Sequence, residues 1–193
     1  MNICVFGASS DNLDPFYYQE AEAFGAILAS ASHHLVFGGG ANGVMAACAR
    51  GAKSSGGVII GIVPRLFDEP GFLFNGCSEI LYTETMSARK EKMFALSDAF
   101  VALPGGIGTL DEFFECITLK QLGVLSGPVV LLNTKGFYTP LLQFLRKLTD
   151  DRFMSSACLE LLQVCDNPAQ AAEACLRKEA LRGSIRRLED YTG

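Results

Sequence analysis

Histidine is scarce in this chain, and its two copies, His33 and His34, are adjacent. They stand just before a predicted strand, away from the glycine-rich segments described below. A histidine-based catalytic triad or a metal site needs ligands that converge from several parts of the chain. We therefore expect both histidines to be structural, and we expect no metal.

Basic residues are also few: 16 lysines and arginines stand against 21 acidic residues, for a net charge of −5. A surface that holds a nucleic-acid backbone needs clustered basic residues, so no nucleic-acid partner is expected. The one basic cluster is interleaved with acids, as on a solvated helix face, and comprises Arg177, Lys178, Arg182, Arg186 and Arg187. This balance still allows a small anionic ligand.

The seven cysteines contain no C-x-x-C pair, and most stand among apolar residues; they are Cys4, Cys48, Cys77, Cys116, Cys158, Cys165 and Cys175. Such cysteines are expected to be buried, reduced thiols. The N-terminus carries no basic segment, and its apolar run is too short for a signal peptide or a membrane span. We therefore expect a cytoplasmic protein with no membrane partner.

The chain has 193 residues, 49% of them hydrophobic, which suits one compact domain spanning residues 1–193. Short apolar runs bounded by glycine alternate with segments of helical periodicity, as in βα units. Strands are predicted near residues 3–6, 35–37, 58–63, 80–82, 99–103, 129–132 and 161–164. Helices are predicted near residues 16–30, 44–54, 87–96, 110–122, 138–149 and 169–176. The pattern predicts a three-layer Rossmann-like α/β fold, with a parallel sheet of about seven strands flanked by helices.

Three predicted strands end in glycine-rich turns that lead into helices, at residues 7–10, 38–43 and 105–109. In a parallel sheet these turns share the carboxyl edge, where open α/β sheets bind ligands. Glycines let the backbone approach an anion, and the free N–H groups of the following helix favour negative charge. A phosphate is the expected guest, with Ser9, Ser10 and Thr109 as hydroxyl donors.

The second turn spells G-x-G-x-x-G, which raises a dinucleotide-dependent oxidoreductase as an alternative. That fingerprint belongs on the first βα turn, with an acidic residue about 20 positions later. Here the next strand ends in Pro64 and Arg65 instead. Arg65 could meet a 2′-phosphate, so this alternative stays open but is less favoured.

The predicted helix that follows the third turn has two contrasting sides. Leu110, Phe113, Phe114 and Ile117 form a stripe expected to face the sheet, and Asp111, Glu112 and Glu115 lie opposite. The acidic residues are expected to border a cleft, although acids in a first helical turn also simply complement the helix dipole. Arg89 and Lys90 begin the preceding helix at the same edge, and arginine suits phosphate or carboxylate.

The motif at residues 104–112, P-G-G-I-G-T-L-D-E, and the element R-K-E-K-M at residues 89–93 are long enough to be specific. They resemble the P-G-G-x-G-T-x-x-E and R-K-x-x-M motifs of the Lonely Guy (LOG) family of cytokinin riboside 5′-monophosphate phosphoribohydrolases. Residues 38–45 are similar to that family's G-G-G-x-x-G-L-M loop, with Val44 in place of leucine. The resemblance runs through nearly the whole chain.

The resemblance implies a nucleotide-binding homodimer that cleaves a purine or cytokinin nucleoside 5′-monophosphate into free base and ribose 5-phosphate. It implies a hydrolysis that needs neither metal nor organic cofactor, with Arg89 and Glu112 at the two catalytic positions. The expected phosphate- and nucleotide-binding residues are Gly7, Ser9, Ser10, Gly39, Gly40, Met86, Lys90, Pro104, Gly105, Gly106, Gly108 and Thr109. Asp111 and Glu115 are secondary candidates.

Cleavage of an N-glycosidic bond builds positive charge on the ribose, and a nearby carboxylate stabilises that transition state. We assign this role to Glu112, which could also bind ribose hydroxyls or orient the attacking water. The turn at residues 104–109 would fix the 5′-phosphate, and Arg89 would stabilise the phosphate or the departing base.

One departure concerns Ser87, which stands where the family often has histidine and bears on base preference or efficiency. Some family members have carried a lysine decarboxylase label, but the sequence offers no specific signal for a pyridoxal phosphate site. A nucleotide-binding carrier or sensor without hydrolytic chemistry is the second hypothesis.

Overall fold

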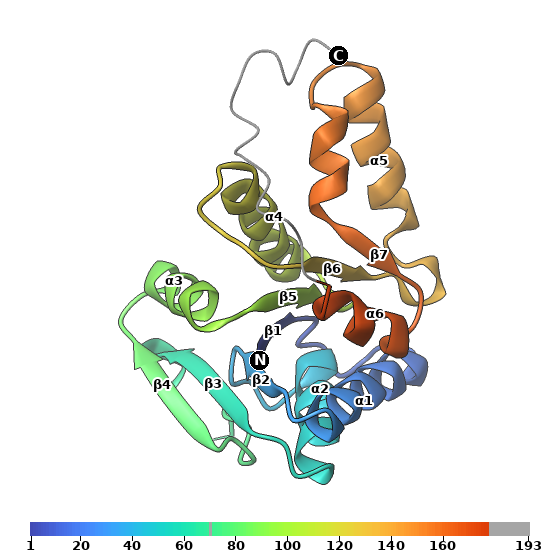
Figure 1. The fold of residues 1–193 in the computed structure, drawn as a ribbon. Helices are drawn as coiled ribbons and strands as arrows, with labels where there is room; N and C mark the ends of the chain where they lie inside the picture. The colour runs from blue at the N-terminus through green and yellow to red at the C-terminus, as the bar shows by residue number, and fades with distance from the viewer. Residues whose placement is uncertain (70, 178–193) are drawn as a thin grey trace.

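A seven-stranded parallel sheet forms the centre of the computed structural model, which describes residues 1–69 and 71–177 (Figure 1). Its strands are β1 (Asn2–Phe6), β2 (His34–Phe37), β3 (Ile59–Pro64), β4 (Glu79–Thr83), β5 (Ala99–Ala102), β6 (Val129–Leu132) and β7 (Gln163–Cys165). Their order is β4-β3-β2-β1-β5-β6-β7, and every neighbouring pair is parallel. The predicted α/β fold is confirmed.

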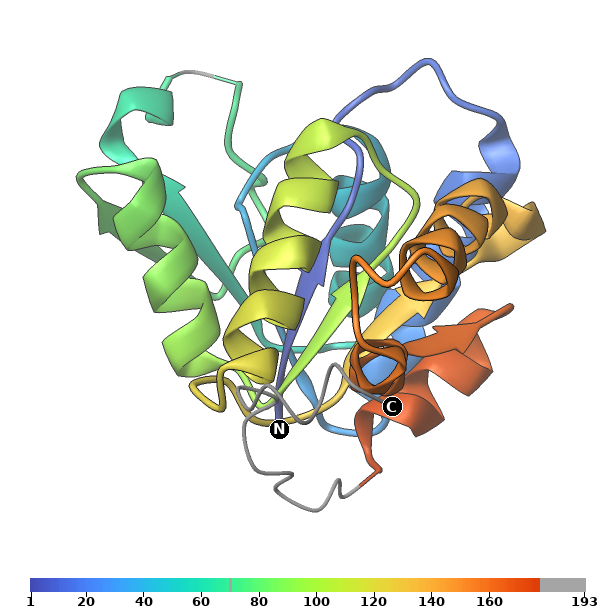
Figure 2. The same cartoon turned by 90° about the horizontal axis from the view of Figure 1, so that it is seen from above.

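Helices cover both faces of this sheet (Figures 1 and 2). One face carries α1 (Pro15–Ser30), α2 (Gly43–Ser54) and α6 (Pro168–Cys175), and the other carries α3 (Met86–Leu96), α4 (Ile107–Gln121) and α5 (Thr139–Asp150). Because side chains alternate along a strand, β1 sends Ile3 and Val5 into one apolar core and Cys4 and Phe6 into the other. The two cores hold the three layers together.

The predicted strands and helices are all present, with bounds that differ by at most a few residues. The largest difference is at α4, which begins at Ile107, whereas the apolar pattern predicts a start at residue 110. Glycines and polar residues fill that first turn, so hydrophobic periodicity does not mark it. The pattern also does not predict the three short 3-10 helices of the described chain, Arg65–Phe67, Thr134–Gly136 and Ser156–Leu161.

The buried side of α4 differs from the predicted one. Its buried residues are Thr109, Glu112, Phe113 and Cys116, whereas Phe114 is 36% exposed. The prediction was wrong for Phe114 because it ranked positions by hydrophobicity alone, whereas Glu112 borders a cleft as predicted. In the structure Glu112 turns inward, where Arg89 of α3 meets its charge.

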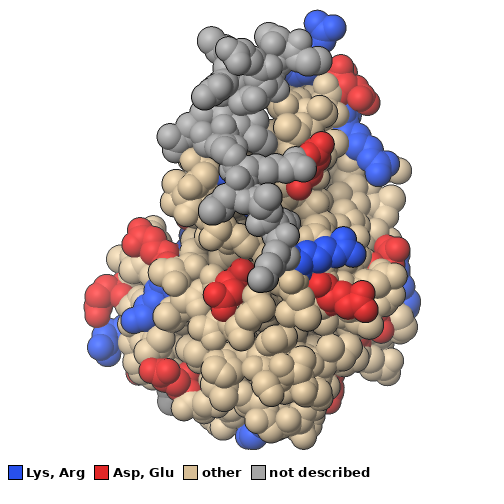
Figure 3. Space-filling view, viewed as in Figure 1, with Lys and Arg blue, Asp and Glu red and all other residues tan. Residues whose placement is uncertain are grey.

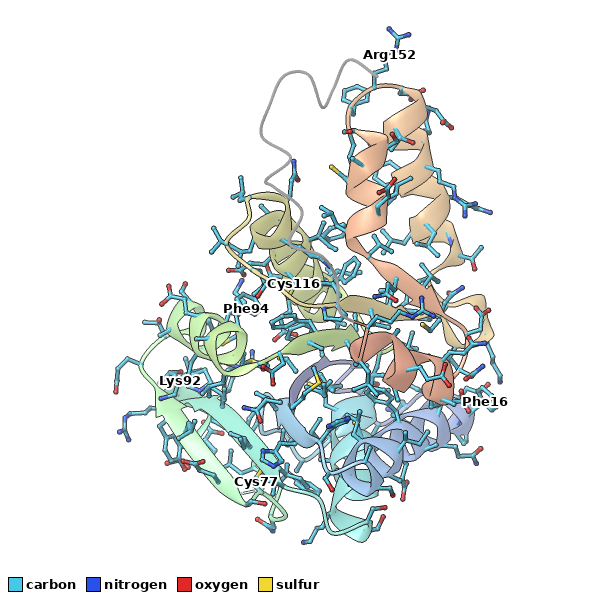
Figure 4. The ribbon with its side chains drawn as sticks, viewed as in Figure 1. Phe16, Cys77, Lys92, Phe94, Cys116 and Arg152 are labelled. Carbon is cyan, nitrogen blue, oxygen red and sulfur yellow. The ribbon has the colours of Figure 1, made fainter. Side chains whose placement is uncertain are left out.

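All seven cysteines lie within the described residues, and all are free. Six are buried, as predicted, and Cys77 is half-buried. Cys116 on α4 and Phe94 on α3, both labelled in Figure 4, belong to the same apolar core. Burial raises the pKa of the Cys48 thiol to about 12, so it is a poor nucleophile.

Basic and acidic side chains are interspersed on the face shown in Figure 3. Within residues 1–69 and 71–177, no helix combines the length and apolarity needed to span a bilayer. In the same part of the chain, no three His, Cys, Asp or Glu side chains gather as metal ligands would. The predicted basic cluster lies outside the described residues, except for Arg177.

Candidate active site

The strand order reverses between β1 and β5, which are neighbours at the centre of the sheet. After β1 the chain runs to α1 on one face, and after β5 it runs to α4 on the other. The two turns therefore diverge and leave a crevice at the carboxyl ends of the strands, the usual ligand site of such sheets. A backbone hydrogen bond joins them at its base, where Ala8 N donates to Pro104 O at 3.1 Å.

A pocket of about 400 Å³ opens at this crevice. Eleven of the predicted site residues line it: Gly7, Ser9, Ser10, Met86, Arg89, Lys90, Gly106, Gly108, Thr109, Asp111 and Glu112. Five do not line it, namely Gly39, Gly40, Pro104, Gly105 and Glu115. Three lining residues were not predicted, namely Ala8, Met45 and Ile107. Their apolar side chains carry no chemical signal, although Met45 ends the glycine motif that the sequence singles out.

The first turn of α4 supplies the pocket with backbone donors. Its N-cap is Gly106, which has no side chain to accept from the first N–H groups. By contrast, Asp14 caps α1 and Thr85 caps α3, and Asp11 Oδ1 accepts from Gly43 N at 2.7 Å where α2 begins. Of the helices that begin around the crevice, α4 is the one whose N-terminus keeps its donors for an anion.

The turn between β2 and α2 is closed by the protein itself. Gly39 O accepts from Phe74 N at 2.9 Å, and Ala41 N donates to Phe72 O at 2.8 Å. Gly40 pairs with Leu73 in a short antiparallel bridge. These contacts explain why Gly39 and Gly40 lie away from the pocket although their sequence motif resembles a phosphate loop.

Arg89 and Glu112 meet at the floor of the pocket. Arg89 Nη1 lies 3.2 Å from Glu112 Oε1, and the two side chains are only 11% and 9% exposed. Arg89 Nε also donates to the carbonyl of Ile62 in β3 at 3.2 Å. The guanidinium is thus held between the sheet and α4, and the sequence prediction that Arg89 and Glu112 share one edge agrees with this geometry.

Burial raises the pKa of Glu112 above its ordinary value because the charged carboxylate loses solvation. The positive charge of Arg89 opposes that rise. Glu112 is therefore a buried carboxyl group with a perturbed pKa in a cleft, and such groups are typical of functional sites.

Lys90 takes part in a separate ion-pair group at the pocket rim. Its Nζ lies 2.9 Å from Asp111 Oδ2 and also pairs with Glu115. These contacts raise the pKa of Lys90, so it stays protonated. Its charge is already shared between two carboxylates of α4, and it ties α3 to α4 beside the Arg89–Glu112 pair.

The fold and this pocket define a Rossmann-like α/β protein with a ligand site at the switch point of its sheet. The family described as possible lysine decarboxylase matches residues 45–175. A cytokinin riboside 5′-monophosphate phosphoribohydrolase of Rhodococcoides fascians is 36% identical over 177 residues, covering 91% of this chain and 89% of the relative. A cytokinin riboside 5′-monophosphate phosphoribohydrolase of Arabidopsis thaliana, LOG3, is 38% identical over 160 residues, covering 83% of this chain and 74% of the relative.

Among solved structures, the molybdenum cofactor carrier protein of Chlamydomonas reinhardtii is similar, with a TM-score of 0.70 and 26% identity. That similarity covers 90% of this chain and 94% of the carrier. The chain belongs to the Lonely Guy family of cytokinin riboside 5′-monophosphate phosphoribohydrolases, as its motifs predicted.

Proposed function

We propose that this protein hydrolyses the N-glycosidic bond of a purine or cytokinin nucleoside 5′-monophosphate and releases free base and ribose 5-phosphate. The observation that carries the proposal is the buried Glu112 carboxylate, which pairs with Arg89 of α3. Glu112 lies on α4, and the uncapped N-terminus of α4 faces the pocket. The named activity of the relatives gives the same reaction.

The geometry of α4 matches the shape of the substrate. The N–H groups of its first turn would bind the 5′-phosphate, and Ser9 and Ser10, which also line the pocket, would donate to it. Glu112 lies five residues after Ile107, roughly 7 Å along the helix axis at 1.5 Å per residue. That offset suits a ribose 5-phosphate whose phosphate is anchored at the helix end and whose anomeric carbon faces Glu112.

In the reaction, water adds to the anomeric carbon, the C–N bond breaks, and its electron pair leaves with the base. The ribose passes through an oxocarbenium-like state, which the Glu112 carboxylate stabilises. Glu112 also orients the water that attacks this state. The attacking water loses one proton to Glu112, and that proton then passes to the departing base nitrogen, which returns Glu112 to its ionised form. Arg89 places its positive charge 3.2 Å from Glu112 and so favours the ionised carboxylate, and this buried ion pair is what we add to the role inferred from sequence.

Lysine decarboxylation is less consistent with the pocket. Decarboxylation through a Schiff base needs a neutral lysine amine. Lys90 is the lysine among the described pocket residues, and two carboxylates hold it in the protonated form. The pocket therefore fits glycosidic hydrolysis better than amine chemistry.

Met45, Met86 and Ile107 give the pocket an apolar part, which suits a flat purine or a base with an apolar substituent. A second candidate function is binding without hydrolysis, favoured by the similarity to a cofactor carrier protein. Both functions use the same phosphate-binding helix end. They differ in whether Glu112 performs chemistry.

The test is to incubate the protein with AMP, with isopentenyladenosine monophosphate and with a panel of other purine monophosphates, and to separate the products by chromatography. We expect free base and ribose 5-phosphate, and a rate about 10²–10³-fold lower for Glu112→Gln. Arg89→Ala should also lose activity. Glu91→Gln on the exposed side of α3 is the matched control and should keep the wild-type rate.

Each contrary outcome points to a specific alternative. Release that survives both Glu112→Gln and Arg89→Ala would refute the assigned roles. Binding of a monophosphate without release would favour the carrier. Tight binding of a pyridine dinucleotide would favour the oxidoreductase.

We also propose that the enzyme is a cytoplasmic homodimer. Its seven free cysteines suit a reducing compartment. Phe114, Leu122 and Val124, on and just beyond α4, expose apolar surface that a second copy could cover. Sedimentation velocity should give the mass of two chains, and a monomer would contradict the proposal.

A further inference from the structure

The carboxyl end of β2 lies directly under the guanidinium of Arg89. Gly38 follows β2 immediately and is buried. A side-chain carbon at this position would lie 2.1 Å from Arg89 Nη2 and 3.1 Å from Arg89 Cζ. The first distance is too short for any Cβ, so the guanidinium occupies the space that a side chain at position 38 would need.

The other contacts of Arg89 fix the plane of the same group. Its Nε donates to the carbonyl of Ile62 in the neighbouring strand β3. The register pairs Phe37 with Gly61, so Gly38 and Ile62 are next to each other at the end of the two strands. The guanidinium therefore lies across both strand ends and reaches Glu112 with Nη1. If a side chain at position 38 displaced the guanidinium, Arg89 could not keep its contacts with both Ile62 and Glu112.

We infer that Gly38 is a positioning residue: the absence of a side chain there seats Arg89 on the sheet so that it faces Glu112. The expected effect on rate rests on the proposed function, but the placement of the Arg89 guanidinium against Gly38, called the Arg89 seat below, is a claim about geometry alone. It also gives a physical reason for the first glycine of a motif that otherwise resembles a phosphate loop.

The substitution Gly38→Ala separates this role from ordinary packing. Its φ lies outside the left-handed region, so alanine fits the backbone, and the atoms in the way all belong to the guanidinium of one long side chain, Arg89. We expect the variant to fold, with Arg89 displaced. Because a misplacement of about 1 Å can cost about 10²-fold in rate, kcat should fall by that order, whereas KM should change little with the phosphate still held by α4.

Gly76→Ala is the matched control. Its added carbon would lie 2.4 Å from Phe74 and 2.6 Å from Lys53, again side-chain atoms, but outside the pocket. We expect its kcat to equal that of the wild type. An equal loss in Gly76→Ala and Gly38→Ala would mean that crowding anywhere harms the enzyme, and it would overturn the inference.

A double-mutant cycle tests whether Gly38 acts through Arg89. Gly38→Ala should lower kcat in the wild type and should have no further effect on residual activity or on thermal unfolding in the Arg89→Ala background. Additive losses would overturn the inference. A Gly38→Ala variant that fails to fold would also overturn it, because the added carbon would then meet more than the arginine.

A titration of Glu112 keeps this test independent of hydrolysis. The charged or titratable groups around Glu112 are Arg89 and Lys90 from α3, Asp111 on its own helix, and the thiols of Cys4 and Cys116. Among them, Gly38→Ala moves only Arg89. The Glu112 carboxyl signal in carbon NMR, assigned with Glu112→Gln, should therefore titrate at higher pH in Gly38→Ala than in wild type.

If Glu112 titrated at the same pH in Gly38→Ala as in wild type, the claim that Gly38 positions Arg89 would be refuted, even in an active enzyme. If the wild type hydrolyses nothing but the titration moves as expected, the seat is upheld and the proposed function fails.

Discussion

Two glycine-rich turns at the same edge of the sheet have similar compositions and opposite uses. In the turn at residues 38–43, protein groups fill the space that side chains would take: Arg89 at Gly38, Val63 at Gly39 and the Ala8 carbonyl at Gly43. In the turn at residues 105–109, the Thr109 side chain fills that space at Gly105, but an added carbon at Gly106 or Gly108 would meet no atom within 4 Å. The first turn makes room for the Arg89 guanidinium, and the second leaves room for a ligand.

The comparison teaches that a glycine motif reports a close approach of backbone, not the identity of what approaches. Both turns satisfy the pattern expected of a phosphate loop. What separates them is capping: Asp11 accepts from the start of α2, whereas no side chain caps α4. Asp11, 32 positions before Gly43, and the Ala8 carbonyl, which accepts from Val44 N at 2.8 Å, therefore make the start of α2 unavailable to an anion.

The largest expected effect on stability is that of Gly43→Ala in the first turn. Gly43 has φ of +72°, and its added carbon would lie 2.3 Å from the backbone oxygen of Ala8. We expect a loss of at least about 2 kcal/mol in the free energy of unfolding, measured with urea. Gly40→Ala, in the same turn but with open space around its added carbon, should stay within about 1 kcal/mol of wild type. Equal losses in both variants would remove the distinction within this turn.

Gly108→Ala should have the reverse profile. The added methyl group lies in the first turn of α4 and in open space, so the fold should be as stable as wild type or slightly more stable. It enters the pocket, however, and we expect about tenfold weaker binding of ribose 5-phosphate by calorimetry, a change of about 1.4 kcal/mol. Undiminished binding would place the phosphate elsewhere.

Tyr138→Phe should loosen the second turn by a smaller amount. The Tyr138 hydroxyl donates to the carbonyl of Leu103 at 2.7 Å, just before that turn, and the tyrosine is buried. Removing the donor leaves a buried carbonyl unpaired, which costs about 1–3 kcal/mol of stability. Hydrogen exchange should rise at residues 104–109 and stay unchanged at residues 38–43. A uniform rise across the molecule would show that Tyr138 supports the whole fold.

The smallest expected effect is a pH dependence of stability that comes from Glu112. Its pKa in the folded state is raised, so over the pH range above the ordinary value the folded protein keeps a proton that the unfolded chain has lost. This contribution to stability is present at low pH and is lost as pH rises through the folded-state pKa. Thermal unfolding should show Glu112→Gln gaining stability relative to wild type as pH rises above about 4.3, the ordinary pKa of a glutamate. A pH-independent difference would contradict the raised pKa.

The sequence predicts the architecture well because buried parallel strands and amphipathic helices leave clear periodic patterns. It also predicts that Arg89 and Glu112 share one edge, since each begins a helix that follows a strand. It predicts that Glu112 borders a cleft but not that its side chain is almost fully buried, because that burial depends on the ion pair with the distant Arg89. Nor does it predict the cap by Asp11 or the apolar lining by Met45 and Ile107, which depend on contacts between segments and not on local pattern.

The central claim is that a monophosphate anchored at the N-terminus of α4 presents its anomeric carbon to Glu112. A crystal structure of the Glu112→Gln variant soaked in AMP tests it most directly. We predict the phosphate on the N–H groups of residues 107–109 and the ribose C1′ next to the side chain at position 112. A phosphate bound at residues 38–43, or a ribose remote from position 112, would contradict it.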